Sequence, residues 1–423
     1  METNLANNLI ALEDKFGAHN YHPLPVVLTK GEGVFVWDVD GKKYFDFLSA
    51  YSAVNQGHCH PRITKALIDQ ANTLALTSRA FYNDCLGEYE KYVTNLFGFD
   101  KVLPMNTGAE AVETAIKLSR KWAYEKKGIE ENKALIVVCE GNFHGRTTTI
   151  ISFSSDPDSN KNFGPYAPGF LAIPYDDIPA LEKVLKLPNV VGFLVEPIQG
   201  EAGVYTPSDN YISNARNLCT ENGALFIADE VQTGIGRTGS LLAVCGNCNC
   251  EQKCERQKNT YSRPDILILG KALSGGVYPV SAVLADDEIM LVIKPGQHGS
   301  TFGGNPIAAK VAIAALEAVN DENLIQNARK LGAFFRSEMN RIISKSDLVL
   351  KVRGKGLLNA IVVNDSETGK TAWNLCIALK ENGLLAKPTH GNIIRFAPPL
   401  IITKEQITVC IDIIEKTLKS FKK

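Results

Sequence analysis

The chain has 423 residues, 45% hydrophobic and 22% charged, which is typical of a globular protein large enough for two or three lobes. Its formal net charge is −1, so composition gives no electrostatic case for nucleic acid or an anionic membrane as a partner. No apolar stretch is long enough to span a bilayer. The first five residues resemble neither a secretory signal nor a mitochondrial transit peptide. We therefore expect a cytoplasmic protein, with the mitochondrial matrix as the alternative if a presequence has been removed.

Taken in chain order, the elements begin with a hairpin. Alternating apolar runs at residues 33–37 and 43–47 flank an Asp40-Gly41 turn. Strand and helix patterns then alternate to about residue 320, which is typical of an α/β domain. A helical pattern over residues 325–343, a strand pattern over 357–363 and a closing helix over 404–421 follow.

A helix that could bind an anion begins after Thr107. Thr107 is a candidate N-cap, and Glu110 three residues later completes a capping box. The free backbone N–H groups of Gly108 and Ala109 would face an anion such as a phosphate, and the helix dipole favours it. Capping boxes are common, so an ordinary capped helix without a ligand is the alternative.

Three short apolar runs each end in a charged residue. Residues 192–195 precede Glu196, residues 224–228 precede Asp229, and residues 266–270 precede Lys271. Continuous apolar runs are typical of strands buried on both faces of a parallel sheet. Ligands bind beyond the carboxyl ends of such strands, so the three charged residues should share one crevice.

Lys271 and Asp229 together suit pyridoxal phosphate. Desolvation lowers a lysine pKa and makes the amine a nucleophile toward a carbonyl, so Lys271 could form the Schiff base. Asp229 would hold the pyridine nitrogen protonated, and the ring could then accept electrons from the substrate. Taken alone, Lys271 could equally be a surface lysine that has left the core.

Eight segments resemble the class-III, fold-type-I aminotransferases that use pyridoxal phosphate. They are residues 17–25, 47–58, 104–108, 196–203, 229–234, 269–276, 298–301 and 394–399. Their order along the chain extends the resemblance over nearly its whole length. It implies an α/β fold in which residues 51–320 form a large cofactor domain with a mostly parallel sheet. Residues 1–50 and 321–423 would together build a smaller α+β domain.

The resemblance also implies a cofactor site. Phe143 would stack on the pyridine ring, Val231 would pack on its other face, and Gln232 would bind the ring hydroxyl. Ser300 and Thr301 would reach the phosphate of a partner subunit, which implies a homodimer. The full set of expected cofactor residues is Thr107, Gly108, Ala109, Phe143, Glu196, Asp229, Val231, Gln232, Lys271, Ser300 and Thr301. Position 144 is His here, where animal members have Trp, so the resemblance assigns it no role.

Within the family, the resemblance is to the ornithine δ-aminotransferases. It implies transfer of the δ-amino group of L-ornithine to 2-oxoglutarate, giving glutamate-5-semialdehyde, which cyclises to pyrroline-5-carboxylate, and glutamate. Arg146 would hold the carboxylate remote from the reacting carbon, and Arg395 the carboxylate beside it. Glu201 would mask Arg395 when ornithine binds, and Tyr21 and Tyr51 would close on the α-amino end of ornithine. A structural ion pair and core tyrosines are the alternative.

Two other functions stay open on the sequence. Acetylornithine and 4-aminobutyrate aminotransferases would share Lys271, Asp229 and the phosphate site, and Tyr21 discriminates against them. A catalytically inactive binding protein is the non-enzymatic alternative. The joint presence of Lys271, Asp229, Arg146 and Arg395 argues against it.

Ten cysteines in a chain without a secretory signal are expected to be mostly free thiols. Cys245, Cys248, Cys250 and Cys254 lie close together in what looks like an insertion relative to the family. A plain surface loop is the leading interpretation, because the spacings are tighter than paired zinc knuckles and no histidine is near. A metal site and a redox-sensitive loop are the alternatives.

Overall fold

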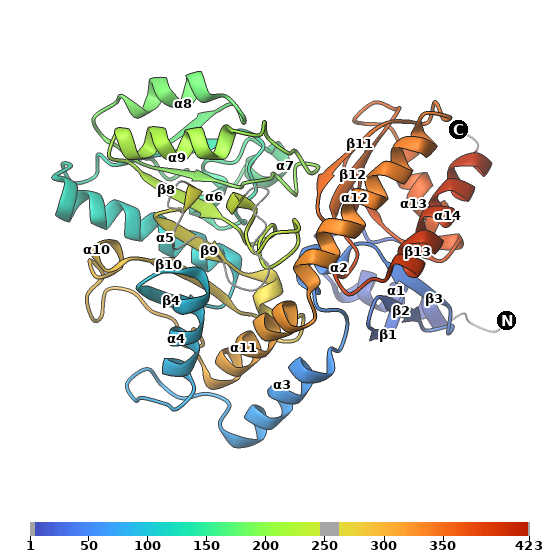
Figure 1. The fold of residues 1–423 in the computed structure, drawn as a ribbon, viewed down its shortest axis with the longest axis horizontal. Helices are drawn as coiled ribbons and strands as arrows, with labels where there is room; N and C mark the ends of the chain where they lie inside the picture. The colour runs from blue at the N-terminus through green and yellow to red at the C-terminus, as the bar shows by residue number, and fades with distance from the viewer. Residues whose placement is uncertain (1–4, 246–261, 422–423) are drawn as a thin grey trace.

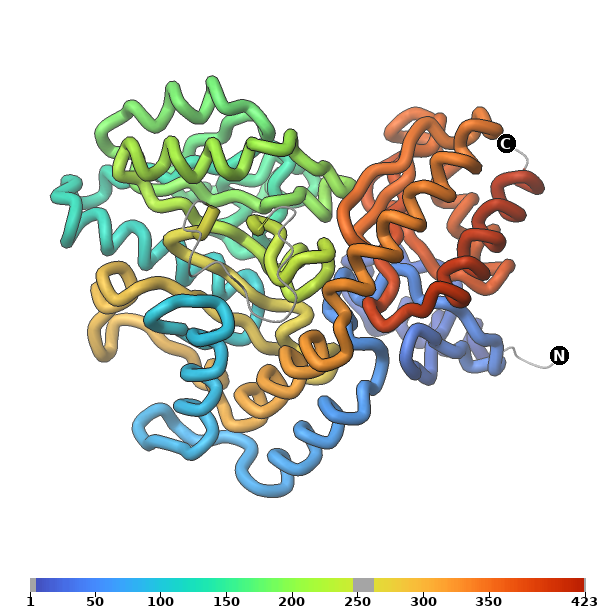
Figure 2. The backbone as a smooth tube through the Cα atoms, in the orientation of Figure 1, coloured from blue at the N-terminus to red at the C-terminus, as the bar shows by residue number. Residues whose placement is uncertain are grey.

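The computed structural model describes residues 5–245 and 262–421. Figures 1 and 2 show two lobes. The large lobe contains a seven-stranded sheet, and the small lobe contains two four-stranded sheets and both described ends of the chain. Helix α2 (Ser49–Ser52) lies between the lobes. Within these described residues, no helix is both long and apolar enough to cross a membrane.

The large lobe has a mostly parallel sheet, as predicted. Its strands run in the order β4-β10-β9-β8-β7-β5-β6, and β6, β5, β7, β8 and β9 are mutually parallel. Strand β10 is antiparallel to both β4 and β9. The strands are β4 (Lys101–Met105), β5 (Leu135–Cys139), β6 (Phe170–Ile173), β7 (Val190–Val195), β8 (Leu225–Asp229), β9 (Ile266–Leu269) and β10 (Ser281–Ala285). Every residue of β7, β8 and β9 is buried, so helices must cover both faces.

Alternate residues of these strands enter two different cores. In β8, Phe226 and Ala228 belong to one hydrophobic cluster, and Leu225 and Ile227 belong to the other. Helices α8 and α9 contribute to the first cluster, and α5 contributes to the second. The large-lobe helices are α3 (Pro61–Thr73), α4 (Leu86–Phe97), α5 (Gly108–Trp122), α6 (Thr148–Ile151), α7 (Pro157–Asn160), α8 (Ile178–Leu185), α9 (Tyr211–Glu221), α10 (Asp287–Met290) and α11 (Pro306–Asp321).

The small lobe combines both ends of the chain. The predicted hairpin is present as β2 and β3, and β3 also pairs in parallel with β13 near the C-terminus. A second, antiparallel sheet has the order β11-β12-β15-β14. The elements are α1 (Leu5–Phe16), β1 (Leu28–Glu32), β2 (Phe35–Asp38), β3 (Lys43–Asp46), α12 (Leu324–Ile343), β11 (Val349–Lys355), β12 (Leu358–Val363), α13 (Thr371–Glu381), β13 (Leu384–Leu385), β14 (Lys387–His390), β15 (Ile393–Phe396) and α14 (Lys404–Ser420). The domain boundaries near residues 50 and 320 stay a prediction.

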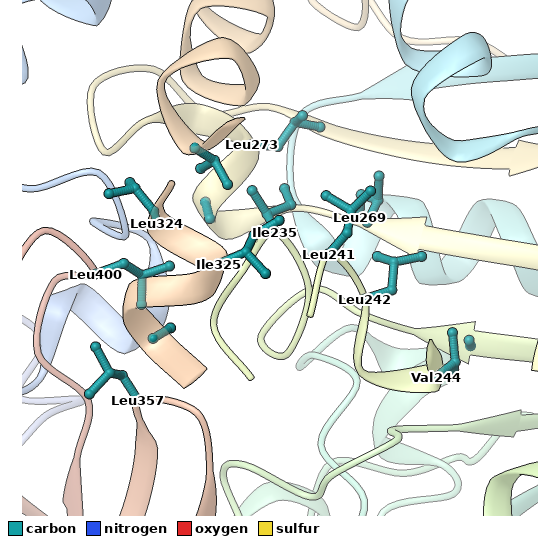
Figure 3. Close-up of a cluster of buried hydrophobic side chains, with 14 of the residues drawn as sticks. Ile235, Leu241, Leu242, Val244, Leu269, Leu273, Leu324, Ile325, Leu357 and Leu400 are labelled. Atoms are coloured by element: carbon teal, nitrogen blue, oxygen red, sulfur yellow. The ribbon is translucent and has the colours of Figure 1, made fainter. Parts of the chain in front are cut away.

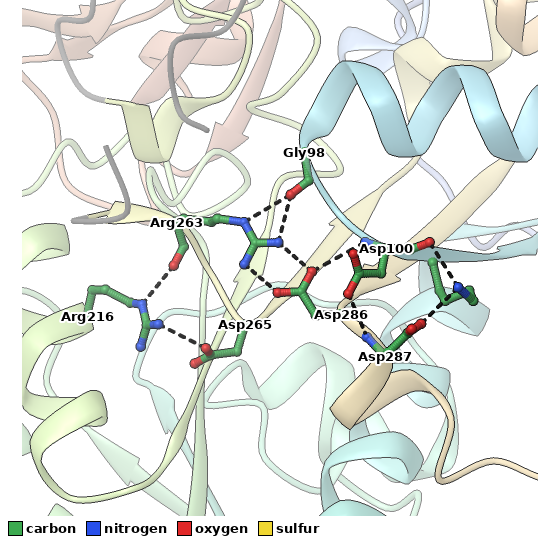
Figure 4. A network of polar contacts seen from close by, with 8 residues as sticks. Gly98, Asp100, Arg216, Arg263, Asp265, Asp286 and Asp287 are labelled. Atoms are coloured by element: carbon green, nitrogen blue, oxygen red, sulfur yellow. Dashed lines mark hydrogen bonds and ion pairs between the residues drawn. The ribbon is translucent and has the colours of Figure 1, made fainter. Parts of the chain in front are cut away.

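Ion pairs fix the end of the large sheet that lies away from Lys271. Arg263, just before β9, donates to both carboxylate oxygens of Asp286 at 2.6 and 2.8 Å and to the carbonyl of Gly98 (Figure 4). Arg216 on α9 donates to Asp265 at 2.9 Å. Bidentate arginine–carboxylate pairs are geometrically specific, so this network sets the relative positions of β9, β10, α4 and α9.

The two lobes share a hydrophobic cluster and a buried arginine. The labelled side chains of Figure 3 are Ile235, Leu241, Leu242, Val244, Leu269 and Leu273 from the large lobe and Leu324, Ile325, Leu357 and Leu400 from the C-terminal part. Beside them, the fully buried Arg237 donates to Asn55 Oδ1, to the Leu357 carbonyl at 3.0 Å and to the Pro398 carbonyl at 2.6 Å. Burial lowers the pKa of the Arg237 guanidinium to about 9. Arg237 therefore ties three distant segments together through neutral acceptors.

We predict that Arg237→Met lowers the free energy of unfolding by about 3 kcal/mol, because three buried acceptors lose a charged donor. The midpoint of thermal unfolding of the cofactor-loaded protein should fall by several degrees. Arg341→Met is the control, since Arg341 pairs with Glu415 at the surface and should hardly shift that midpoint. Equal midpoints for Arg237→Met and the unmodified protein would contradict this role.

Candidate active site

A cavity of about 190 Å³ lies at the carboxyl ends of β7, β8 and β9. Glu196, Asp229 and Lys271 all line it, which confirms the crevice predicted from the three strand ends. The remaining lining residues are Gly108, Ala109, Phe143, His144, Gly145, Ile198, Glu201, Val231, Gln232 and Thr233. Gly145, Ile198 and Thr233 were not predicted, because nothing in the sequence separates them from ordinary core and turn residues.

The N-terminus of α5 opens onto this cavity. The predicted capping box is present: Thr107 accepts from the Glu110 N–H, and the Glu110 carboxylate accepts from the Thr107 N–H at 2.9 Å. Gly108 and Ala109 begin the helix, so their N–H groups have no acceptor within it. A Cβ on Gly108 would lie 3.0 Å from Val231 Cγ1, so only glycine fits here without displacing Val231. The arrangement suits a phosphate group.

Lys271 follows β9 directly and has a left-handed backbone, with φ of 42°. Such a conformation costs energy for a residue with a Cβ and is found preferentially at functional sites. Burial lowers the pKa of the Lys271 amine, and the nearby Glu201 carboxylate opposes that effect. A larger share of the amine is therefore unprotonated and nucleophilic than in water.

Asp229 is held by two hydrogen bonds. The His144 Nδ1 donates to Asp229 Oδ2 at 2.6 Å, and the Val231 N–H donates to Oδ1 at 3.0 Å. Burial alone would lower the pKa of His144, but the bond to Asp229 and its charge outweigh burial and raise it. Among the residues that the structure describes, His144 Nε2 is buried without a partner. His144, which the resemblance left without a role, therefore orients the Asp229 carboxylate.

Glu196 fixes the residue expected to stack on the cofactor. Its Oε2 accepts from the Phe143 N–H at 2.9 Å. Burial raises the pKa of the Glu196 carboxyl to about 7. The Arg146 guanidinium lies 5.8 Å from the centre of the Phe143 ring. Glu196 thus acts on the backbone around Phe143.

Glu201 and Arg395 form an ion pair between the lobes. The Arg395 guanidinium, on β15, donates to Glu201 Oε2 at 2.9 Å and to the Gly200 carbonyl at 3.2 Å, with Gln232 Oε1 at 3.5 Å. Burial would raise the pKa of Glu201, but the charge of Arg395 and its hydrogen bond lower it overall. Glu201 lines the cavity, and Arg395 behind it is buried.

The two tyrosines lie in different settings. Tyr51 is in α2, where residues 49–52 all have positive φ, and its ring centre is 5.2 Å from the Arg395 guanidinium. Burial raises the pKa of Tyr51, and the charge of Glu201 adds to that effect. Tyr21 is 68% exposed and lines a separate hollow beside α1. Only Tyr51 is thus in direct contact with the arginine of this site.

Ser300 and Thr301 do not line the cavity of their own chain, within the part that the structure describes. Ser300 Oγ accepts from Asn106 Nδ2 at 2.7 Å and from the Gly303 N–H at 3.1 Å, and Thr301 is exposed. Their contact with a partner's phosphate stays a prediction.

The nature of the cysteine insertion also stays a prediction, since Cys248, Cys250 and Cys254 are outside the described residues. Cys59, Cys85, Cys139, Cys219, Cys376 and Cys410 are free thiols, as predicted.

Comparison with known proteins identifies the family. Residues 16–418 match the class-III aminotransferases. This chain belongs to that family. The mitochondrial ornithine aminotransferase of Drosophila ananassae is 61% identical over 98% of this chain and 92% of its own length. The mitochondrial ornithine aminotransferase of Rattus norvegicus is 58% identical over 97% and 90%.

Two solved structures show the same fold. The ornithine aminotransferase of Toxoplasma gondii, which holds pyridoxal phosphate at partial occupancy, has a TM-score of 0.93 at 47% identity over 98% of this chain and 94% of that one. The acetylornithine aminotransferase of Elizabethkingia anophelis has a TM-score of 0.88 at 62% identity over 99% and 100%. The names of these relatives thus include two different substrates, ornithine and acetylornithine.

The cofactor of this family is pyridoxal phosphate, and the residues present fit it. The helix N-terminus at Gly108 offers unpaired N–H groups to a phosphate, and Lys271 offers an amine of lowered pKa to an aldehyde. Asp229 offers a fixed carboxylate to a ring nitrogen. The apolar side chains of Phe143 and Val231 line the space between them.

Lys271→Ala is expected to fold and to lose all transamination, because the amine is both the covalent anchor and the proton carrier. After reduction with borohydride and denaturation, cofactor should stay bound to the unmodified protein on gel filtration and should separate from Lys271→Ala, which has no amine at this position to form the reducible imine. Lys127→Ala is the matched control, since burial also lowers the pKa of Lys127, which donates to the Val190 carbonyl outside the cavity. Near-normal turnover by Lys271→Ala would rule out this assignment.

Proposed function

We propose that this enzyme transfers the δ-amino group of L-ornithine to 2-oxoglutarate, giving glutamate and glutamate-5-semialdehyde, which cyclises to pyrroline-5-carboxylate. The observation that carries the proposal is the Glu201–Arg395 pair at the cavity that contains Lys271. An arginine paired with a carboxylate of the same protein can bind the carboxylate of one substrate when that pair opens, and can stay neutralised by the pair when another substrate binds. The relatives named ornithine aminotransferase support the same substrate.

Recognition has to serve two different substrates in turn. Glutamate and 2-oxoglutarate carry a carboxylate next to the reacting carbon, and Arg395 binds it after Glu201 swings away. Ornithine reacts at its δ-carbon, which has no neighbouring carboxylate, so Glu201 stays on Arg395 and prevents an unpaired buried charge. Arg146 binds the distant carboxylate of either substrate, and Tyr21 and Tyr51 close on the α-amino end of ornithine.

The large lobe supplies the chemistry. Bound pyridoxal phosphate provides an electron sink for the carbon that loses a proton. Lys271 would take that proton from the substrate carbon and return it, because its amine lies at the cavity with a pKa lowered by burial. Asp229, oriented by His144, keeps the ring nitrogen protonated. Thr107, Gly108 and Ala109 hold the phosphate, Phe143 and Val231 hold the ring faces, and Gln232 holds the ring hydroxyl.

A homodimer would complete the site, with Ser300 and Thr301 of each chain reaching the phosphate held by the other. Exposed apolar side chains support this proposal, because a monomer leaves them in water. They include Phe16, Phe81, Tyr82 and Phe302.

An assay with 2-oxoglutarate as acceptor tests the substrate. Ornithine, N-acetylornithine and 4-aminobutyrate would be compared by kcat/KM, and we expect ornithine to exceed the others by at least about tenfold. The free α-amino group of ornithine has the tyrosines as partners, whereas acetylation removes its charge. The Elizabethkingia relative makes acetylornithine the second candidate. A higher kcat/KM with N-acetylornithine would replace our proposal by that one.

Glu201→Ala should change substrate preference more than overall competence. Single-turnover rates with glutamate and with ornithine would each be followed by the change in cofactor absorbance. The glutamate rate divided by the ornithine rate should rise by about tenfold or more, because the lost charge-assisted contact is worth roughly 1.5–3 kcal/mol. A parallel fall of both rates would make Glu201 a structural partner of Arg395 only.

A further inference from the structure

Glu201 lies in a tight loop that belongs to the large lobe. Gln199 and Tyr205 form an antiparallel bridge, with N–H to carbonyl distances of 3.1 and 3.0 Å, and residues 200–204 make the loop between them. Gln199 Nε2 donates to the Glu140 carbonyl at 2.7 Å, beyond the end of β5. The base of the loop is therefore anchored to the large sheet.

The tip of the same loop is bound by the small lobe. Three loop carbonyls accept hydrogen bonds from three side chains on three strands of the sheet β11-β12-β15-β14. Arg395 on β15 donates to Gly200, Thr389 on β14 donates to Glu201 at 2.7 Å, and Arg353 on β11 donates to Gly203 at 2.8 Å. These donors are 150 to 195 positions away along the chain, so no local pattern predicts them.

Packing leaves this loop little room to move. A Cβ on Gly203 would lie 2.6 Å from Ile393 Cδ1 and 3.0 Å from Arg353 Nη2, so the backbone touches the sheet directly. The Arg353 guanidinium also lies 3.7 Å from the centre of the Tyr205 ring, at the base of the loop. Such stacking adds to the hydrogen bond and fixes the plane of the guanidinium.

The backbone of Glu201 thus has one orientation with respect to Arg395. The Thr389 hydroxyl holds its carbonyl, and Arg353 holds the carbonyl two residues later. Exchange of the Arg395 partner between Glu201 and a substrate carboxylate then requires only rotation of the Glu201 side chain. A loose loop would let the carboxylate drift from Arg395 and weaken the mask in the ornithine half-reaction.

We propose that Thr389 and Arg353 are positioning residues that set the preference for ornithine over glutamate by fixing the loop that carries Glu201. This inference rests on the proposed function of Glu201 as the mask of Arg395. Each residue donates its hydrogen bond to a backbone carbonyl of the loop, so we expect each to act through the position of Glu201.

Thr389→Val tests the hydroxyl at nearly constant volume. The single-turnover rate with glutamate divided by the rate with ornithine should rise about 3- to 10-fold, which corresponds to the loss of one neutral hydrogen bond. Thr389→Ser should restore the original ratio, since it keeps the donor. Thr408→Val is the control, because Thr408 makes the same kind of bond to the Lys404 carbonyl on exposed α14 and should leave the ratio unchanged.

Arg353→Lys tests the second contact. Lysine keeps the charge but loses the Nε donor and the planar stack, so the ratio should shift in the same direction as in Thr389→Val. The control is Arg120→Lys, since Arg120 on α5 donates to the Pro168 carbonyl at 2.9 Å and lies 4.9 Å from the Phe170 ring centre, outside the cavity. The thermal midpoints of both variants would show whether a general loss of stability accompanies the shift.

A double variant decides whether Thr389 acts through Glu201. Adding Thr389→Val to Glu201→Ala should change the ratio no further, because the carboxylate that the loop positions is already gone. An equal effect of Thr389→Val in both backgrounds, or an unchanged ratio in the single variant, would overturn the inference. The single-turnover rate of the unmodified enzyme with ornithine tests the proposed function separately. If that enzyme does not react with ornithine, the proposed function itself fails.

Discussion

Two fully buried arginines at the lobe interface constrain the rest of this structure. Arg237 and Arg395 are both enclosed, and a buried cation must be given hydrogen-bond acceptors or a counter-charge. Arg237 has the neutral acceptors Asn55, Leu357 and Pro398, whereas Arg395 has the carboxylate of Glu201. Arg237 therefore holds the lobes together. In the proposed function, Arg395 exchanges the Glu201 carboxylate for that of a substrate and so distinguishes the substrates that enter between the lobes.

The large lobe solves a different electrostatic problem. Two carboxylates, Glu196 and Asp229, lie in one cavity with Lys271, and burial favours the neutral forms of Glu196 and Lys271. His144 donates to Asp229 Oδ2 at 2.6 Å, whereas burial raises the pKa of Glu196 to about 7. The carboxylate proposed to face the ring nitrogen of the cofactor is thus the one that has a histidine donor. Separate environments give neighbouring carboxyl groups separate roles.

The sequence predicted the features that depend on local pattern. The three apolar runs before Glu196, Asp229 and Lys271 specify buried parallel strands, and such strands bring their ends together by topology alone. The Thr107 capping box also needs only four residues. The contacts of Arg237, Thr389 and Arg353 could not be predicted, since all their acceptors are far away in sequence and all but Asn55 Oδ1 are backbone carbonyls. A carbonyl is present at every residue, so its use as an acceptor leaves no trace in composition or spacing.

The separation between groups of the large lobe and contacts at the lobe interface explains how related enzymes can share one reaction and differ in substrate. The lysine, the aspartate and the phosphate-binding helix all come from the large lobe, and their geometry follows from strands and a helix cap. In the proposed function, substrate choice depends on Arg395, Glu201 and the loop between the lobes, where small-lobe side chains donate to the carbonyls of Gly200, Glu201 and Gly203. A change of one hydroxyl on β14 would alter the position of Glu201 without touching the groups that move the proton. Selectivity can therefore vary at the lobe interface while the chemistry beneath it stays the same.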